Sequence, residues 1–235
     1  MAEAILKKFQ DVPLKVIVDG TLGTGGHSIE LAGVLEPGGT LIGLDRDPDM
    51  VERAERRLKN EVKRSDVKIV TKRAKYEQIA ETLEAEGLAG ADAVLLDLGI
   101  NSLHVDMASR GFSFSQEGPL DMRFDPSEPG VSPAEGIVNH AGEADLRRWI
   151  RDYSDERFAG KIARRIVAER RKAPITSTVQ LAELIRECYP PKARYQKPHP
   201  ATRTFQALRV VTNSEIESVE RGVKACMEAL TPGGI

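Results

Sequence analysis

A glycine-rich turn near the N-terminus has residue types that could bind a ligand. It spans residues 18–28 (VDGTLGTGGHS) and directly follows an apolar stretch. Its glycines permit a sharp reversal and let a ligand approach the backbone closely. The spacing matches neither the dinucleotide pattern G-x-G-x-x-G nor the phosphate loop G-x-x-x-x-G-K-[ST], and the turn contains no lysine. Because dehydrogenases, kinases and simple tight turns also use glycines in this way, the turn alone does not identify the ligand.

Asp19 adds a carboxylate at the beginning of this turn. A carboxylate there would repel a pyrophosphate, but it could accept a hydrogen bond from an ammonium group. The residue therefore favours a positively charged, phosphate-free ligand such as S-adenosylmethionine over NAD. An NAD-dependent oxidoreductase remains the rival interpretation, and a titration with the two cofactors distinguishes them.

Two further acidic residues end apolar stretches. Asp45 lies 19 residues beyond Gly26, where an acidic side chain can accept hydrogen bonds from ribose hydroxyls. It could instead cap the helix that begins near Pro48, although Asp47 can fill that role. Asp97 ends the stretch LLD, and the carboxyl ends of parallel strands line the ligand crevice of an open α/β sheet. Alone, Asp97 would be taken for a polar residue in a turn.

Apolar and helical segments alternate over the first hundred residues, and they would position these side chains. Strands are expected at 14–18, 40–44, 67–70 and 93–96, and helices at 27–35, 48–60 and 76–86. This alternation predicts an α/β fold with a doubly wound parallel sheet.

The pattern changes after Asp97. Residues 99–133 are rich in Gly, Pro, Ser and Asp, and loops of this length are usually functional. Helices are expected afterwards at 143–153, 155–172, 178–188, 201–211 and 214–230. We therefore expect an α/β domain formed by residues 1–106 and 197–235, interrupted by a mostly helical insertion at 107–196.

Charge is distributed unevenly along the 235 residues. The net charge is −2, yet residues 147–209 contain 16 Lys and Arg against 6 Asp and Glu. A basic region of this kind favours binding to nucleic acid, although solvated helix faces would show the same composition.

Other features exclude several classes of protein. The two cysteines, Cys188 and Cys226, belong to no Cys-x-x-Cys or Cys/His cluster, so we expect neither a disulfide nor a metal site. No run of eighteen apolar residues is present, and residues 1–10 lack the pattern of a targeting segment. We expect no membrane association and a reducing compartment.

Six motifs in a fixed order carry a family resemblance. They are VDGTLGTGGHS, LDRDP, LLDLGINS, RGFSF, GPLDMRFDP and HPATRTFQALRV. Together they resemble the MraW-type 16S ribosomal RNA cytosine-N4 methyltransferases over residues 16–234. The resemblance implies a class I (Rossmann-like) methyltransferase domain with a helical insertion and S-adenosyl-L-methionine as cofactor. It also implies that 16S-type ribosomal RNA or the small ribosomal subunit is the partner, in the cytoplasm or in an organelle matrix or stroma. The oligomeric state stays open.

The resemblance also implies which residues form the site. Tyr76 stands where the family commonly has Phe beside the adenine, and His104 stands where the family has a Gln. We interpret His27 as a cofactor contact instead of a general base, because the positive end of a helix favours a neutral imidazole. The implied cofactor contacts are Gly25, Gly26, His27, Asp45, Tyr76, Asp97 and His104.

Asp97 is also the expected catalytic residue, as the acceptor for the protons of the cytosine amine, with Asn101 and Ser102 as possible helpers. The target base must be unstacked to reach such a crevice, so a basic surface should hold the RNA backbone. Candidates for that surface are Arg110, Arg123, Arg203 and the helices within residues 147–172.

The two ends of the chain depart from the family. Residues 1–13 replace an apolar segment of the family, which could alter the entry to the cofactor site. The family continues beyond Pro232-Gly233-Gly234 into further strands, so we expect the last three strands of the sheet to be missing. This predicts a catalytically weak or inactive chain, and an RNA-binding or ribosome-assembly relative is the alternative function.

Overall fold

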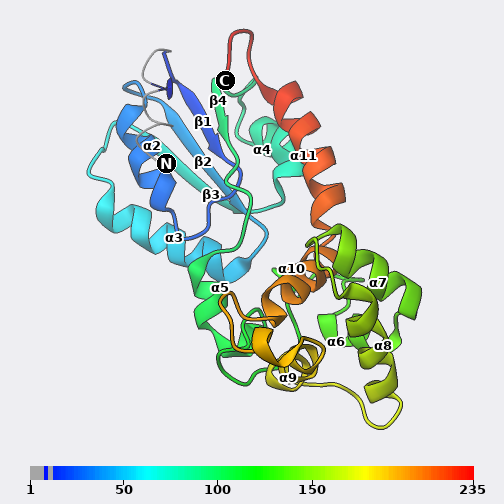
Figure 1. Cartoon of the computed structure of the whole chain (residues 1–235). Coiled ribbons are helices and arrows are strands. Elements are labelled where there is room, and N and C mark those ends of the chain that lie inside the picture. Colours follow the sequence, from blue (N-terminus) through cyan, green and yellow to red (C-terminus); the bar gives the residue numbers. More distant parts are fainter. Residues whose placement is uncertain (1–7, 10–12) are drawn as a thin grey trace. The chain divides into compact units, whose positions relative to one another are not determined.

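The computed structural model describes residues 8–9 and 13–235, which form two compact units (Figure 1). The first unit comprises the described residues up to Gly99 together with Glu217–Ile235, and the second comprises Ile100–Ile216. The expectations about residues 1–10 and 1–13 fall mainly on residues 1–7 and 10–12, which lie outside the described part of the chain.

A parallel sheet forms the centre of the first unit. Its strands are β1 (Val16–Asp19), β2 (Thr40–Asp45), β3 (Lys68–Arg73) and β4 (Ala93–Leu95). Their order is β3-β2-β1-β4, and Ile17 of β1 is in register with Leu41 on one side and Ala93 on the other. The order of the strands reverses between β1 and β4, which makes their carboxyl ends the switch point where ligands bind in open α/β sheets.

Helices cover both faces of this sheet, as they must when parallel strands are buried (Figure 1). They are α2 (Gly26–Val34), α3 (Pro48–Glu61), α4 (Ile79–Ala85) and α11 (Glu215–Ala229). Ile17 packs with Leu31 of α2 in one apolar cluster, whereas its neighbour Val18 packs with residues of α4 and α11 in another. The alternation along each strand thus assigns the helices to opposite faces.

Backbone hydrogen bonds continue beyond α11 along β4. The Ala91 N–H donates to the Ala229 carbonyl at 2.9 Å, and the Val94 N–H donates to the Ile235 carbonyl at 2.9 Å. β4 therefore has backbone partners on both of its sides.

The second unit is mostly helical, as expected. It contains α5 (Ser102–Asp106), α6 (Ala134–His140), α7 (Glu143–Asp152), α8 (Ala159–Arg170), α9 (Thr178–Glu187) and α10 (Ala201–Thr212). Ile150, Ile162, Leu181 and Leu208, from α7 to α10, are fully or almost fully buried in one core. Ile162 and Ile166, four residues apart in α8, lie on its buried face.

The boundaries of the units differ from the expected ones. α10 contacts α6, α7 and α9 and belongs to the second unit, whereas the sequence placed it in the α/β domain. α8 begins at Ala159 and not at residue 155, because Asp155 has a φ of 50°, outside the helical region. Of the helices that the structure describes, none is both long and apolar enough to cross a membrane.

Candidate cofactor site

The glycine-rich turn leaves β1 and enters α2. Gly23 and Gly25 have φ values of 51° and 79°, and Gly25 is the N-cap of α2. Residues other than glycine rarely adopt such φ values, so the turn requires glycine at these positions. Gly26 and His27 are the first residues of α2, where backbone N–H groups are exposed at the end of the helix. Gly25, Gly26 and His27 therefore lie together, at the carboxyl end of β1.

Asp19 does not have the role that its position suggested. Its side chain is 1% exposed, and it accepts hydrogen bonds from the Ser28 hydroxyl at 2.6 Å and the Thr21 N–H at 3.2 Å. Burial raises the pKa of Asp19, while the hydrogen bonds from Ser28 and Thr21 oppose that shift. Because this carboxylate is enclosed, it braces the turn against α2 and is not available for a ligand ammonium group.

Asp45 connects the end of β2 to the glycine-rich turn. One carboxylate oxygen accepts the Gly23 N–H at 2.8 Å, and the other accepts the Asp47 N–H at 2.9 Å. Asp47 caps α3 by accepting from the Asp49 N–H, as the sequence indicated. Asp45 is half-buried, so its carboxylate both shapes the turn and stays within reach of a ligand.

Asp97 follows β4, and two contacts join it to the turn. Its backbone N–H donates to the Thr21 hydroxyl oxygen at 2.7 Å, and its carboxylate lies 3.3 Å from the His27 Nε2. The side chains of His27 and Asp97 are 29% and 45% exposed. The structure therefore brings together an exposed carboxylate, an imidazole and the glycine-rich turn at the switch point of the sheet.

Tyr76 begins a short 3-10 helix, Tyr76–Gln78, after β3. Its ring packs on α11, where a Cβ added to Gly222 would lie 2.0 Å from the ring atom Cε2. The next residue, Glu77, accepts hydrogen bonds from Ser218 at 3.0 Å and from Arg221 at 2.9 Å, both in α11. These contacts fix the start of the 3-10 helix to α11, and nothing in the local sequence around Tyr76 indicated them.

His104 belongs to the second unit. Its side chain is buried, and its ring centroid lies 4.9 Å from that of Phe112 and 5.3 Å from that of Phe124. Asn101 caps α5 by accepting the Leu103 N–H at 3.0 Å. The cofactor contact expected of His104 and the helper role of Asn101 stay predictions.

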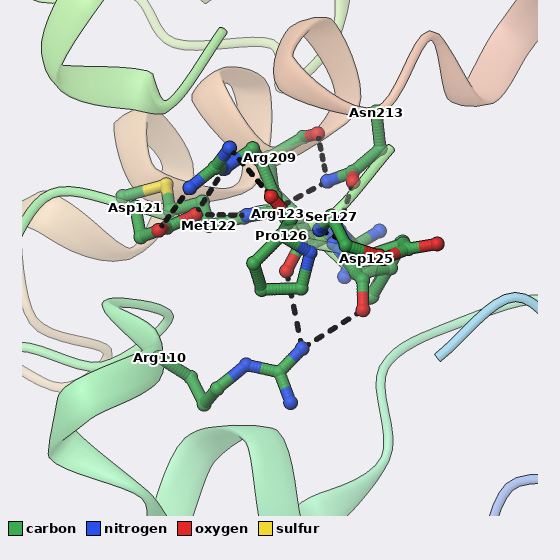
Figure 2. Close-up of polar contacts among 10 residues, drawn as sticks. Arg110, Asp121, Met122, Arg123, Asp125, Pro126, Ser127, Arg209 and Asn213 are labelled. Carbon is green, nitrogen blue, oxygen red and sulfur yellow. Dashed lines mark hydrogen bonds and ion pairs between the residues drawn. The ribbon is translucent and has the colours of Figure 1, made fainter. Parts of the chain in front are cut away.

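Figure 2 shows a loop of the second unit that belongs to the motif GPLDMRFDP. Met122, at its centre, is fully buried and has a φ of 61°, a rare value for a residue with a side chain. The Asn213 carboxamide holds the loop by donating to the Met122 carbonyl at 2.7 Å and accepting the Phe124 N–H at 2.8 Å. Asn213 is 91 positions from Met122, so the sequence offered no signal for this contact.

Two arginines expected to hold RNA have structural contacts in this loop. Arg110 is 7% exposed and donates to the Phe124 carbonyl at 2.9 Å and the Arg123 carbonyl at 3.2 Å, so it is not part of an RNA-binding surface. Arg123 binds both carboxylate oxygens of Asp121 at 2.8 Å. Burial alone would raise the pKa of Asp121, but the contacts with Arg123 lower it below its usual value.

The residues gathered in the first unit fit the chemistry of S-adenosylmethionine. Asp45 and Asp97 are exposed or half-buried carboxylates at the ends of β2 and β4, and the turn between β1 and α2 contains no lysine or arginine. Carboxylates suit ribose hydroxyls and an ammonium group, and they oppose a pyrophosphate. Among residues 8–9 and 13–235, no group of three or more His, Cys, Asp or Glu side chains could hold a metal ion.

Comparison with known proteins gives a consistent result. The family model described as the MraW methylase family matches residues 1–235. Ribosomal RNA small subunit methyltransferase H of Pelobacter propionicus is 43% identical over 235 residues, covering all of this chain and 73% of that protein. The protein of the same name from Desulfosudis oleivorans is 41% identical over 94% of this chain and 69% of its own. The chain belongs to the MraW methylase family.

Membership of the MraW methylase family confirms the expected methyltransferase that uses S-adenosylmethionine. The parallel α/β sheet agrees with that expectation. Among solved structures, a putative rRNA-methylase from Clostridium thermocellum is 17% identical, with a TM-score of 0.36 over 42% of this chain and 50% of that one.

Proposed function

We propose that this chain transfers the methyl group of S-adenosylmethionine to the exocyclic N4 of a cytidine in small-subunit ribosomal RNA. The observation that carries the proposal is the exposed Asp97 carboxylate, which lies beside the glycine-rich turn and 3.3 Å from His27. The relatives named ribosomal RNA small subunit methyltransferase H support the substrate class. We further propose that the substrate is the RNA, free or within the small subunit, and that the reaction takes place in the cytoplasm.

In this proposal the first unit binds the cofactor. The backbone at Gly25 and Gly26 forms the floor of the site, and His27 contacts the cofactor as a neutral imidazole. Asp45 accepts hydrogen bonds from the ribose hydroxyls, and Tyr76 lies against the adenine. His104 of the second unit takes the place of the family's Gln.

Asp97 acts on the amine that receives the methyl group. When bound, S-adenosylmethionine supplies an electrophilic methyl group on a positively charged sulfur. The lone pair of a cytosine amine is delocalised into the ring, so the amine is a poor nucleophile. A carboxylate that accepts a hydrogen bond from the amine favours its pyramidal form. Asp97 would also accept the proton that the amine loses when it receives the methyl group from the cofactor. The protein contributes mainly positioning to this transfer.

The test compares Asp97→Asn with the wild type in methyl transfer to protein-free small-subunit RNA. We expect transfer to fall by two or more orders of magnitude, because general base and hydrogen-bond contributions are typically about 10²- to 10⁴-fold. Calorimetry with S-adenosylmethionine separates this loss from weaker cofactor binding. Asp152→Asn, at an exposed position of α7, is the matched control and should behave as the wild type. Undiminished transfer by Asp97→Asn would contradict the role of Asp97.

We also propose that the second unit holds the RNA. It contains the whole basic stretch of residues 147–209, and the helices of that stretch pack around one apolar core. A basic surface of this kind binds phosphates independently of sequence and delivers an unpaired base to a crevice.

A further inference from the structure

A basic pocket opens on the second unit, with a volume of about 540 Å³. It is lined by residues of α8, of the C-terminal end of α9 and of the segment that follows the 3-10 helix Pro191–Ala193. The lining residues are Lys161, Arg164, Arg165, Glu187, Cys188 and Arg194. The pocket therefore has four cationic side chains and a single carboxylate.

The positive charge of this pocket is not neutralised within the protein. The carboxylate of Glu187 accepts a hydrogen bond from Arg165 at 2.9 Å. Burial raises the pKa of the Cys188 thiol, so the sulfur adds no negative charge at neutral pH. In the described part of the chain, Lys161, Arg164 and Arg194 form no ion pair with a carboxylate. Arg194 instead donates to the Tyr189 carbonyl at 3.0 Å, which holds its guanidinium in place.

Other basic side chains of the second unit differ from those of the pocket. Arg170 donates to the Val138 carbonyl at 2.8 Å and to the Ala141 carbonyl, so it ties α8 to the end of α6. Arg148 and Arg151 of α7 pair with acidic neighbours in the same helix. Arg148, Arg151 and Arg170 are thus engaged within the protein, whereas among the described residues three of the four cations that line the pocket are not paired with a carboxylate.

An exposed aromatic ring follows the pocket directly in the chain. Tyr195, next to Arg194, has 80% of its surface exposed, and the Arg186 guanidinium lies 5.2 Å from the centre of its ring. Exposed aromatic rings beside arginines are the usual platforms on which unpaired bases stack. A simple anion would not need such a ring, so the combination favours single-stranded RNA as the ligand.

We infer that Lys161, Arg164 and Arg194 bind backbone phosphates of RNA in this pocket and that Tyr195 stacks on an adjoining unpaired base. This assignment rests on the proposed function for the identity of the RNA. It adds a second point of attachment, remote in the sequence from Asp97, that holds the strand by its backbone and one base. The bases on either side of the stacked one remain free to pair or to enter another site.

The first experiment measures the salt dependence of binding to a protein-free small-subunit RNA transcript. Three phosphate contacts on a single strand release about 0.7 counterion each, so K161Q/R164Q/R194Q should lower the salt slope by about 2 and the affinity at 0.1 M salt about 100-fold. The matched control R148Q/R151Q/R157Q removes the same charge from the same unit outside the pocket, and its slope should change by less than half as much. Equal changes of the salt slope in the two variants would contradict the binding of RNA phosphates in the pocket.

A second variant distinguishes the loss of phosphate contacts from a disturbance of the fold. Because Arg194 also bonds to the backbone, K161Q/R164Q alters only exposed side chains of α8 and should lower the slope by about 1.4. An unchanged slope in this folded variant would also overturn the assignment. Retention of S-adenosylmethionine affinity in both variants shows that the first unit is intact.

The base contact is tested by Y195A with Y195F as its control. Y195A should weaken RNA binding about 5- to 150-fold without changing the salt slope, whereas Y195F keeps the ring and should bind as the wild type. Equal binding by Y195A would overturn the stacking contact. Methyl transfer by the wild type is scored separately. If the pocket variants lose RNA binding but the wild type transfers no methyl group, the proposed function alone is contradicted. If the wild type transfers the methyl group but the pocket variants bind RNA as the wild type does, the pocket alone is contradicted.

Discussion

Gly222 in α11 leaves the space that the ring of Tyr76 occupies. A Cβ at residue 222 would lie 2.0 Å from Cε2 and 2.1 Å from Cδ2 of that ring. Carbon atoms in contact are normally about 3.5 to 4.0 Å apart. Gly222→Ala should therefore displace the ring or α11 by more than an ångström.

Two opposing effects determine how much Gly222→Ala changes the free energy of unfolding. Overpacking of this kind costs about 1 to 3 kcal/mol, while Ala in place of Gly in a helix stabilises by about 1 kcal/mol. We expect a net loss of unfolding free energy between zero and about 2 kcal/mol. The larger effect should be on the cofactor, because a displaced ring loses the proposed contact with the adenine. Loss of one base stacked on an aromatic ring corresponds to about 5- to 150-fold in affinity.

The assay combines urea unfolding with calorimetry of S-adenosylmethionine binding. Gly33→Ala in α2 is the matched control, since nothing lies within 4 Å of an added Cβ there, and it should be neutral or slightly stabilising. In a Tyr76→Ala background, Gly222→Ala should become stabilising and have no further effect on affinity. Wild-type affinity in Gly222→Ala, or the same destabilisation in both backgrounds, would refute the placement of the ring.

Three further predictions concern side chains that hold backbone in place. Asp45→Ala should lower the thermal stability of the cofactor-free protein as well as cofactor affinity, because Asp45 accepts the Gly23 N–H, and unchanged cofactor-free stability would contradict this role. Because the folded pKa of Asp121 is lowered, its contribution to stability is present above about pH 4 and is lost as the pH falls through that lowered value. The difference in urea stability between the wild type and Asp121→Asn should thus shrink toward pH 3, and a constant difference would argue against the pairing with Arg123. Arg170→Gln should cost about 1.5 to 3 kcal/mol and leave the salt slope of RNA binding unchanged, whereas a lower slope would assign Arg170 to the RNA surface.

The central strands β1 and β2 could be predicted closely because nearly all of their residues are buried. The expected strand at 40–44 compares with β2 at Thr40–Asp45, since continuous apolar runs between turn residues have few alternative structures. α5 and α6 were missed because each is shorter than two helical turns, and Gly136 lies within α6. Such short helices are stabilised by tertiary contacts and not by their own sequence.

In the site, features that depend on neighbouring residues could be predicted, whereas contacts between residues far apart in the sequence could not. The turn at Gly25 and the cap at Asp47 depend on neighbours a few residues away, and both were predicted. The sequence assigned Asp19 to the ligand because it gave no sign of the hydrogen bond from Ser28. That bond forms only when the first turn of α2 lies over the end of β1. Gly222, which accommodates the ring of Tyr76, is 146 positions from it, and no periodicity or motif connects the two.

The central claim is that this chain methylates the N4 of a cytidine in small-subunit ribosomal RNA. Its most direct test incubates the purified chain with S-adenosylmethionine and either protein-free small-subunit RNA or intact small subunits. The RNA is then digested to nucleosides and analysed by mass spectrometry. We predict N4-methylcytidine, formed about 100-fold or more slowly when Asp97→Asn replaces the wild type. Methylation of another base or another atom of cytidine, or no methylated nucleoside from a chain that binds S-adenosylmethionine, would contradict the account.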